Sequence, residues 1–276
     1  MRWCSFTTSS GGPARLGAPA SDDSGRVLDV AVWARSRHAE TPPDLVDLLE
    51  SSAATQQRVA DLVRTADEDA RGWVRGEEVT YLAPLRSPNS LRVAPAGGAY
   101  YKGNRRTVLG PDEPVCRPRY ASALEPRLRV GAVVGRRGRD LVPGSAAGHV
   151  FGFVLVNDWT APDVLATESE LGPAKASDFA TSLGPWLVTP DDWDPAQEHA
   201  VAITVDGQLR HSGKASWSFD ALMVRAADGE DLWPTDVLVV GAGGEPGVEV
   251  SAGQQVTLEV DGLGVLTTPV VHSLGV

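Results

Sequence analysis

The chain contains little cysteine and little lysine. Cys4 and Cys116 are the two cysteines among 276 residues, and neither belongs to a C-x-x-C pair. This spacing excludes a cysteine zinc site and a disulfide-rich secreted scaffold, so we expect a reducing, cytoplasmic compartment. Only three of the 25 basic residues are lysine, and with abundant alanine, glycine and proline this composition indicates a high-GC bacterial genome.

Long apolar runs are also missing. The longest, residues 151–156, is far shorter than the roughly 20 residues that a membrane-spanning helix needs. Residues 1–20 contain scattered arginine and glycine rather than the continuous apolar region of a secretory signal. We therefore expect neither a transmembrane segment nor a secretory signal.

Negative charge dominates the composition. The formal net charge is -11, so no general attraction to nucleic acid or to an anionic membrane is expected. The hydrophobic fraction of 42% is sufficient for one large domain, or for a small domain beside a larger one.

The first third of the chain predicts a small α/β unit. Residues 15–30 have the alternation and the central turn residues of a hairpin. Residues 79–82 are predicted to form a strand. Helical spacing of apolar residues follows Pro42, over residues 45–49 and 53–71. Because the prolines of residues 83–88 cannot continue a ladder, we place a domain boundary near Pro84, with domains over 1–83 and 84–276.

The remainder is rich in short strands. The sequence predicts one helix over 218–227, and strands over 128–134, 150–156, 186–189, 200–205, 237–240 and 255–260. Asp206-Gly207 and Asp261-Gly262 indicate tight hairpins. Many strands with few helices favour a folded-over mixed sheet, and an α+β fold class for the whole chain.

Several segments match one family in order and spacing. Phe151-Gly-Phe-Val-Leu-Val-Asn-Asp-Trp-Thr-Ala-Pro-Asp163 is followed by Leu171-Gly-Pro173 and by Asp178-Phe-Ala-Thr-Ser-Leu-Gly-Pro-Trp-Leu-Val188. Together they resemble the central signature of the fumarylacetoacetate hydrolase family. The resemblance covers about residues 81–276, and it implies a mixed β-roll main domain, usually homodimeric, beside the small N-terminal domain.

The resemblance also implies a chemistry. Family members hold a divalent cation and cleave, decarboxylate or isomerise diketo and acylpyruvate acids, reactions that share an enolate which a dication stabilises. Asp158 matches the aspartate ligand of the Asn-Asp turn. The two expected glutamate ligands fall on Arg127 and Arg129, which share one strand face and cannot bind a cation. The guanidinium groups are therefore expected to replace the cation, pair with Asp158 and receive ligand oxygens.

Other family positions also differ. The catalytic lysine falls on Ser177, with Lys175 two residues upstream, and the His-Glu pair that activates water has no counterpart after Pro88-Asn-Ser-Leu-Arg92. Residues 241–244 resemble the backbone loop that caps the substrate carboxylate. From these positions we predict catalytic roles for Lys102, Lys175 and Asp158, and substrate-binding roles for Arg127, Arg129, Tyr101, Ser177, Thr181 and Trp159.

Each assignment has an ordinary alternative. Lys102 matches a lysine at the pocket mouth but equally suits a solvated strand end. Lys175 and Asp178 would form an acid-base couple only if the lysine were desolvated. Trp159 either faces a ligand or fills the core. The hydroxyl groups of Ser177 and Thr181 either replace the missing ammonium or cap the backbone.

The sequence therefore predicts an enzyme that needs no metal or other cofactor. Its partner would be an anionic or keto small molecule, polyketide-like and enolisable, which it cyclises, isomerises, decarboxylates or cleaves. We expect this reaction to belong to biosynthesis. A second hypothesis is a conventional magnesium-dependent hydrolase, with Glu125, Asp158 and either Glu168 or Glu170 as ligands. A third is an inactive homologue that keeps the core and the dimer.

Overall fold

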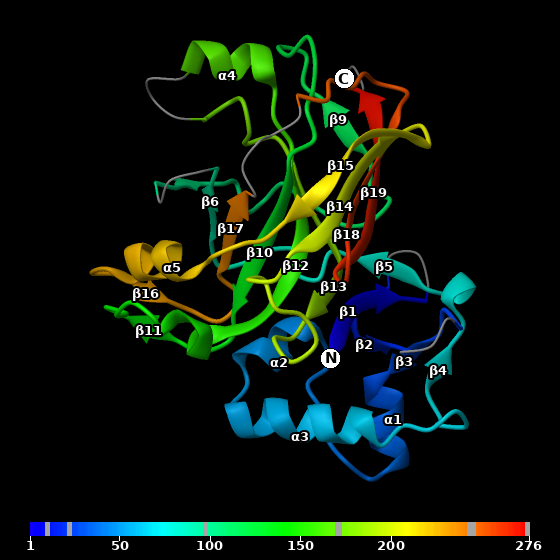
Figure 1. Ribbon diagram of the computed structural model, residues 1–276. Helices are drawn as coiled ribbons and strands as arrows, with labels where there is room; N and C mark the ends of the chain where they lie inside the picture. Colours follow the sequence, from blue (N-terminus) through cyan, green and yellow to red (C-terminus); the bar gives the residue numbers. More distant parts are fainter. Residues whose placement is uncertain (9–11, 21–23, 96–98, 169–172, 242–246, 274–276) are drawn as a thin grey trace.

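The computed structural model describes residues 1–8, 12–20, 24–95, 99–168, 173–241 and 247–273. Two β-sheets lie over one another in the larger part of the molecule, and the N-terminal residues form a smaller part at one end of them (Figure 1). With helices concentrated in the smaller part, the fold is α+β, as the sequence predicts.

The smaller part is made of helices and short strands (Figure 1, blue to cyan). Its helices are α1 (Val30–Ser36), α2 (Leu45–Glu50), α3 (Ala53–Arg64) and the 3-10 turn η1 (Gly76–Glu78). Its strands are β1 (Arg2–Thr7), β2 (Arg15–Pro19), β3 (Val27–Asp29), β4 (Trp73–Val74) and β5 (Thr80–Leu82). Each α-helix begins at a side-chain cap, Asp29, Asp44 or Ser52, whose oxygen accepts a backbone N–H of the first turn.

The large sheet continues from these strands into the main part. Its order is β4-β3-β2-β1-β13-β12-β10-β17-β6-β7, with β5 paired to β1 and β8 to β13. The strands of the main part are β6 (Leu91–Ala94), β7 (Tyr101–Lys102), β8 (Val108–Leu109), β10 (Leu128–Val134), β12 (Val150–Asp158), β13 (Thr181–Val188) and β17 (Val237–Gly241). Parallel and antiparallel pairs both occur, so the sheet is mixed.

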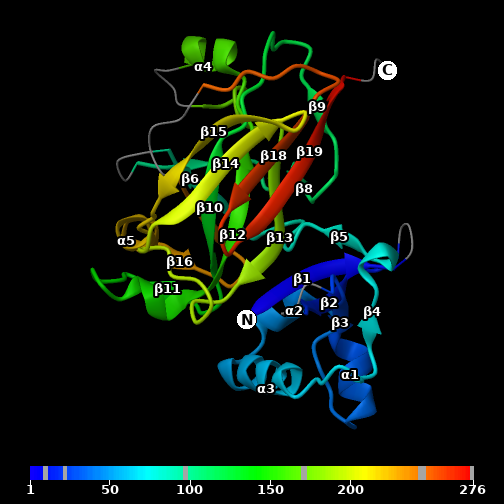
Figure 2. The ribbon, with the colours of Figure 1, turned by 45° about the vertical axis from the view of Figure 1, so that its right-hand side comes forward.

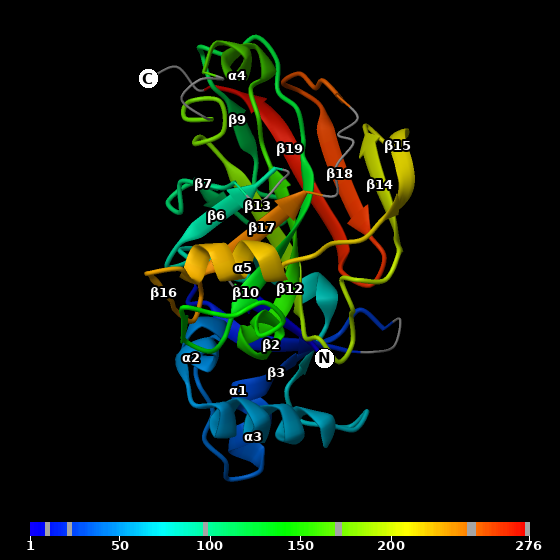
Figure 3. The same cartoon turned by 60° about the vertical axis from the view of Figure 1, so that its left-hand side comes forward.

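The second sheet covers one face of the first (Figure 2). Its order is β15-β14-β18-β19-β9, with bounds β9 (Val115–Arg117), β14 (His199–Val205), β15 (Gln208–Ala215), β18 (Gln255–Val260) and β19 (Gly264–His272). A separate pair joins β11 (Gly138–Arg139) to β16 (Asp231–Leu232). The remaining helices are α4 (Pro162–Glu168), α5 (Asp220–Ala227), which Figure 3 shows in front of β10 and β17, and the 3-10 turn η2 (Ala146–His149).

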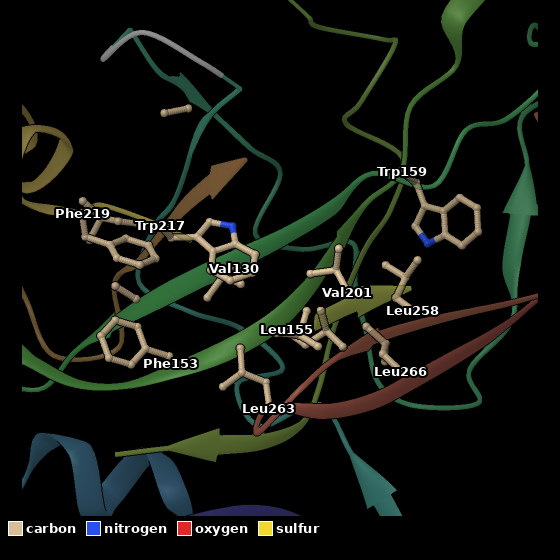
Figure 4. Close-up of a cluster of buried hydrophobic side chains, with 14 of the residues drawn as sticks. Val130, Phe153, Leu155, Trp159, Val201, Trp217, Phe219, Leu258, Leu263 and Leu266 are labelled. Atoms are coloured by element: carbon tan, nitrogen blue, oxygen red, sulfur yellow. The ribbon is translucent and has the colours of Figure 1, made fainter. Parts of the chain in front are cut away.

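Alternation along β10 assigns its two faces to different surroundings. Val130, Ala132 and Val134 belong to the hydrophobic cluster between the sheets, which includes Leu155 and Leu258 (Figure 4). The intervening position Val133 packs instead in a second cluster shared with the N-terminal part. Arg129 and Arg127 therefore lie on the face of β10 that turns away from the inter-sheet core.

Most predicted elements are present with altered bounds. The helix predicted over 53–71 ends at Arg64, and the strand predicted over 186–189 begins at Thr181. Strand β1 and helix α1 were not predicted. Because β1 pairs with β13, through Arg2 opposite Val188 and Trp3 opposite Leu187, the sheet crosses the predicted boundary at residue 84. The division of the chain into two domains, residues 1–83 and residues 84–276, remains a prediction.

Both Asp-Gly hairpins are confirmed. Asp206 and Gly207 link β14 to β15 with positive φ angles of 51° and 74°, as a tight two-residue turn requires. The turn between β18 and β19 contains one residue more, Leu263, after Asp261-Gly262. Among the described helices, none is long and apolar enough to cross a membrane.

Candidate functional site

A row of polar residues crosses the sheet where β12 ends. The N–H of Asp158 donates to the carbonyl of Arg127 at 3.1 Å, and on its other side Asp158 is the register partner of Thr181. Residues opposite one another in a ladder share a face. The three side chains therefore lie together on the face away from the inter-sheet core.

The centre of this row is a buried ion pair. Arg129 Nε lies 2.9 Å from Asp158 Oδ2, and the side chains are only 4% and 2% exposed. A charge that deep in the protein costs several kcal/mol unless it is paired. The pairing of Arg129 with Asp158 that the sequence predicts is thus present.

Tyr101 completes the contact from β7. Its hydroxyl donates to the same oxygen, Asp158 Oδ2, at 2.8 Å. Burial, and then the charge of the Asp158 carboxylate and its hydrogen bond, raise the pKa of the Tyr101 phenol, so it is protonated at neutral pH. The Tyr101 hydroxyl therefore keeps its proton and donates it in a hydrogen bond to a carboxylate that is paired with Arg129.

Two further hydroxyl groups adjoin the tyrosine. The buried Ser177 forms a side-chain hydrogen bond with Tyr101. This bond lowers the pKa of the tyrosine, against the larger effects of burial and of Asp158. The Ser177 Oγ lies 3.3 Å from Oγ1 of Thr160, which also is buried. Ser177 is thus at the site, as predicted, and Thr160 joins it unpredicted.

Arg127 lies nearer the surface than Arg129. Its Nη2 pairs with Oε2 of Glu125, and the two side chains are 15% and 10% exposed. The Arg127 backbone N–H donates to Oδ1 of Asn157 at 2.9 Å, which fixes the chain at this point. Of the two predicted arginines, Arg127 is therefore the more exposed.

The prediction for Lys102 does not fit the structure. Lys102 follows Tyr101 on β7, so its side chain points to the opposite face, where it is 69% exposed and its Nζ lies 3.9 Å from Glu230. A lysine on that face has no route to Asp158. Strand alternation, applied to both residues together, would have excluded one of them.

The prediction for Lys175 is also corrected. Its ammonium is exposed and lies 2.9 Å from Oδ2 of Asp178. The hydrogen bond and charge of Asp178 raise the pKa of Lys175, the opposite of what a neutral lysine base needs. The couple that the sequence predicted exists as a surface ion pair.

Trp159 belongs to the core rather than to the site. Its side chain is buried within the inter-sheet cluster (Figure 4), and Nε1 donates to Oγ of Ser182 at 3.0 Å. Asp158 and Trp159 are adjacent, so they point to opposite faces of the strand. A direct contact with a substrate is therefore excluded for the indole.

The side chains do not suit a divalent cation. Of the proposed ligands, Glu125 and Asp158 each pair with a guanidinium, and Glu168 accepts the backbone N–H groups of residues 174–176. Glu170 and residues 242–244 of the predicted carboxylate loop lie outside the described residues. Within the described ranges, no three His, Cys, Asp or Glu side chains come together. Two guanidinium groups between the carboxylates would repel a dication.

Besides Thr160, sequence reasoning missed the contacts that two residues make on this face, although Gly241 was singled out as part of the segment 241–244. Glu125 was considered only as a metal ligand, although its two-residue spacing from Arg127 places both on one side of an extended chain. Gly241, at the end of β17, is the register partner of Arg129. No local pattern shows that pairing, because it joins residues more than a hundred positions apart.

Comparisons with known proteins agree with this fold. The family model described as "Fumarylacetoacetate (FAA) hydrolase C-terminal" matches residues 74–271. A mitochondrial oxaloacetate tautomerase of Bos taurus, FAHD2B, is 26% identical over 91% of this chain and 86% of its own.

Solved structures share the fold at low identity. A 5-carboxymethyl-2-hydroxymuconate delta-isomerase from Mycobacterium smegmatis has a TM-score of 0.75 at 22% identity, covering 99% of this chain and all of its own. A maleylpyruvate hydrolase of Sphingobium sp. SYK-6, in complex with manganese(II) and pyruvate, has a TM-score of 0.77 at 18% identity, with the same coverage.

Proposed function

The chain belongs to the fumarylacetoacetate hydrolase family of hydrolases, isomerases and tautomerases, and from that premise we propose that it is an enzyme that interconverts an enolisable keto acid and its enol or double-bond isomer without a metal. The observation that carries the proposal is the buried Arg129-Asp158 pair, to which Tyr101 is hydrogen bonded.

Electrostatics would stabilise the enolate. Arg127, partly exposed, offers N–H groups to the planar carboxylate or to the developing enolate oxygen of a keto acid. In a site of low dielectric, a positioned donor of this kind is worth about 2.7–4 kcal/mol, or 10²–10³ in rate. The role that a cation has in other enolate-forming enzymes would here belong to fixed guanidinium groups.

Asp158 and Tyr101 would move the proton. As the substrate C–H bond breaks, its electrons form the enolate, and the Tyr101 oxygen takes the proton while passing its own to Asp158. The return transfer delivers that proton to the enolate oxygen or to another carbon. The sequence is an isomerisation, with no net change in protons and no water consumed.

A metal-dependent reaction is less consistent with these residues. The manganese in the maleylpyruvate hydrolase belongs to that protein. In this chain, the ion pairs of Glu125 and Asp158 already use the carboxylates that a metal would need. We therefore assign no step to a cation.

The test uses oxaloacetate, the substrate class in the relative's name, and follows enol absorbance with and without EDTA. We expect EDTA-resistant tautomerisation that falls at least 100-fold in Arg127→Gln and Arg129→Gln. Arg119→Gln, at an exposed arginine, is the matched control and should keep full activity. Activity that disappears in EDTA and returns with magnesium or manganese would reject the metal-free proposal, as would wild-type rates in both site variants.

A further inference from the structure

The guanidinium of Arg129 occupies the space beside Gly241. A Cβ at position 241 would lie 2.4 Å from Nη1 of Arg129 and 2.9 Å from the carbonyl oxygen of Pro95. Both distances are far inside van der Waals contact, where repulsion rises steeply. Any residue other than glycine would have to displace one of these groups.

Backbone conformation does not explain this glycine. Gly241 is not among the residues with positive φ, and it is the last residue of strand β17. In such a strand a glycine weakens the element unless something approaches closely. The close approach here comes from a charged side chain of β10 that is 4% exposed.

The contact is linked to the catalytic groups. Arg129 Nε bonds Asp158 Oδ2, and that same oxygen accepts the Tyr101 hydroxyl. If the guanidinium moves by the width of a methyl group, the 2.9 Å contact to Asp158 cannot persist, and the acceptor of Tyr101 loses its neutralising partner. The position of the phenol thus depends on the space left at residue 241.

We propose that Gly241 is a positioning residue. The space beside its Cα holds the Arg129 guanidinium in place, and Arg129 in turn fixes the Tyr101 hydroxyl through Asp158. This inference rests on the proposed function, but the contact itself can be tested by stability alone. In this role Gly241 acts through Arg129, and not through the carboxylate-capping contact that the sequence of residues 241–244 resembles. Its effect should therefore appear in kcat more than in KM.

The experiment is a double-mutant cycle between residues 241 and 129. Gly241→Ala is made in the wild type and in Arg129→Lys, which keeps the positive charge but removes the Nη atoms that the new methyl group would meet. Thermal unfolding and oxaloacetate tautomerisation are measured for all four proteins. Coupled residues give non-additive effects in such a cycle.

We expect Gly241→Ala alone to lower Tm by several degrees and kcat at least tenfold, with KM changed less than threefold. In Arg129→Lys the same substitution should lower Tm by less than half as much. If Gly241→Ala alone does not fold, a folded double variant gives the same support. Gly213→Ala is the matched control, because this glycine of β15 has only His211 Nε2 nearby, at 3.9 Å, and it should leave Tm and kcat unchanged.

Other outcomes reject the inference. Equal Tm losses in both backgrounds, or no folded double variant, would assign the constraint to the Pro95 carbonyl alone. A wild-type kcat in Gly241→Ala would remove the link to Tyr101 even if the stabilities are coupled. A wild type without tautomerase activity would reject the proposed function. The Tm values of the double-mutant cycle would still decide whether Gly241 holds the Arg129 guanidinium in place.

Discussion

Tyr101, Arg129 and Asp158 form a chain in which each group depends on the next. Arg129 compensates the buried carboxylate, and the carboxylate accepts the phenol proton. Removal of either charged member takes away the charge that compensates the other, whereas removal of the Tyr101 hydroxyl keeps both charges. Single substitutions therefore separate the contribution to stability from the contribution to catalysis.

Tyr101→Phe removes one hydroxyl and keeps the ring. We expect tautomerisation to fall about 10²–10⁴-fold, the usual contribution of a positioned acid-base group. Circular dichroism should show an unchanged fold. Tyr120→Phe, at a tyrosine that is 48% exposed, is the control and should keep its rate. Equal rates in both variants would exclude Tyr101 from proton transfer.

Asp158→Asn leaves the shape of the side chain but removes the charge that Arg129 faces. An unpaired buried guanidinium is costly, so we expect a loss of about 3–5 kcal/mol in the free energy of unfolding, measured by urea titration. Asp178→Asn, which breaks the exposed pair with Lys175, should cost less than about 1 kcal/mol. Similar losses would mean that the Arg129 pair is not desolvated.

At this scale the sequence predicted which site residues share a strand face better than it predicted the contacts of their neighbours. Strand periodicity and the family resemblance together placed Arg127, Arg129 and Asp158 on one face. They failed for Lys102 and Trp159, because each was considered apart from the neighbour that occupies the site face. The segment 241–244 was singled out, but the contact of Gly241 with Arg129 could not be predicted, since it joins strands distant in sequence.

At the scale of elements, the hairpin between β14 and β15 is fixed by its turn. The Asp206 carboxylate accepts the N–H of Gln255 at 2.8 Å and Nε2 of Gln254 at 3.0 Å, which joins the turn to β18. These hydrogen bonds, the Gln255 N–H first, lower the pKa of Asp206 from its ordinary 3.8. The sequence predicted the turn from Asp-Gly but not this link, which is formed in three dimensions.

The lowered pKa sets the direction of a pH effect. An acid with a depressed folded-state pKa contributes stability that is fully present above the unfolded pKa and disappears as pH falls through the folded value. The stability of Asp206→Asn should therefore be below that of the wild type at pH 7, and the difference should shrink at pH 3 and lower. Urea unfolding at both pH values measures this, and a difference independent of pH would contradict it.

Burial patterns did not decide which elements were predicted. Strand β18 alternates in burial, but β10 and β12 were predicted although nearly every position in them is buried. Strand β1 has the same continuous burial and was missed, as was α1, which has only seven residues. Both are stabilised by tertiary packing rather than by a local pattern.

At the scale of the whole molecule, the N-terminal part and the main part share a hydrophobic cluster. Trp3 of β1 and Leu48 of α2 pack in the same cluster as Val154 of β12 and Val239 of β17. A core that spans both parts predicts that they unfold together. We expect one calorimetric transition for the full chain.

Trp3→Ala tests that coupling. Trp3 is 1% exposed, so we expect a loss of about 3–5 kcal/mol and a lower Tm for the single transition. Trp233→Ala, at a tryptophan that is 47% exposed, should change Tm little. Two separate transitions, with only one of them moved by Trp3→Ala, would instead favour independent domains over 1–83 and 84–276.

Strand β10 contributes Val130, Ala132 and Val134 to the core between the sheets, and Arg129 to the opposite, polar face beside Asp158. If Leu128 were deleted while the chain before it kept its register, Arg129 would turn toward the inter-sheet core and Val130 would take its place on the polar face. A substitution along this stretch keeps the two faces apart, whereas a deletion of one residue exchanges them.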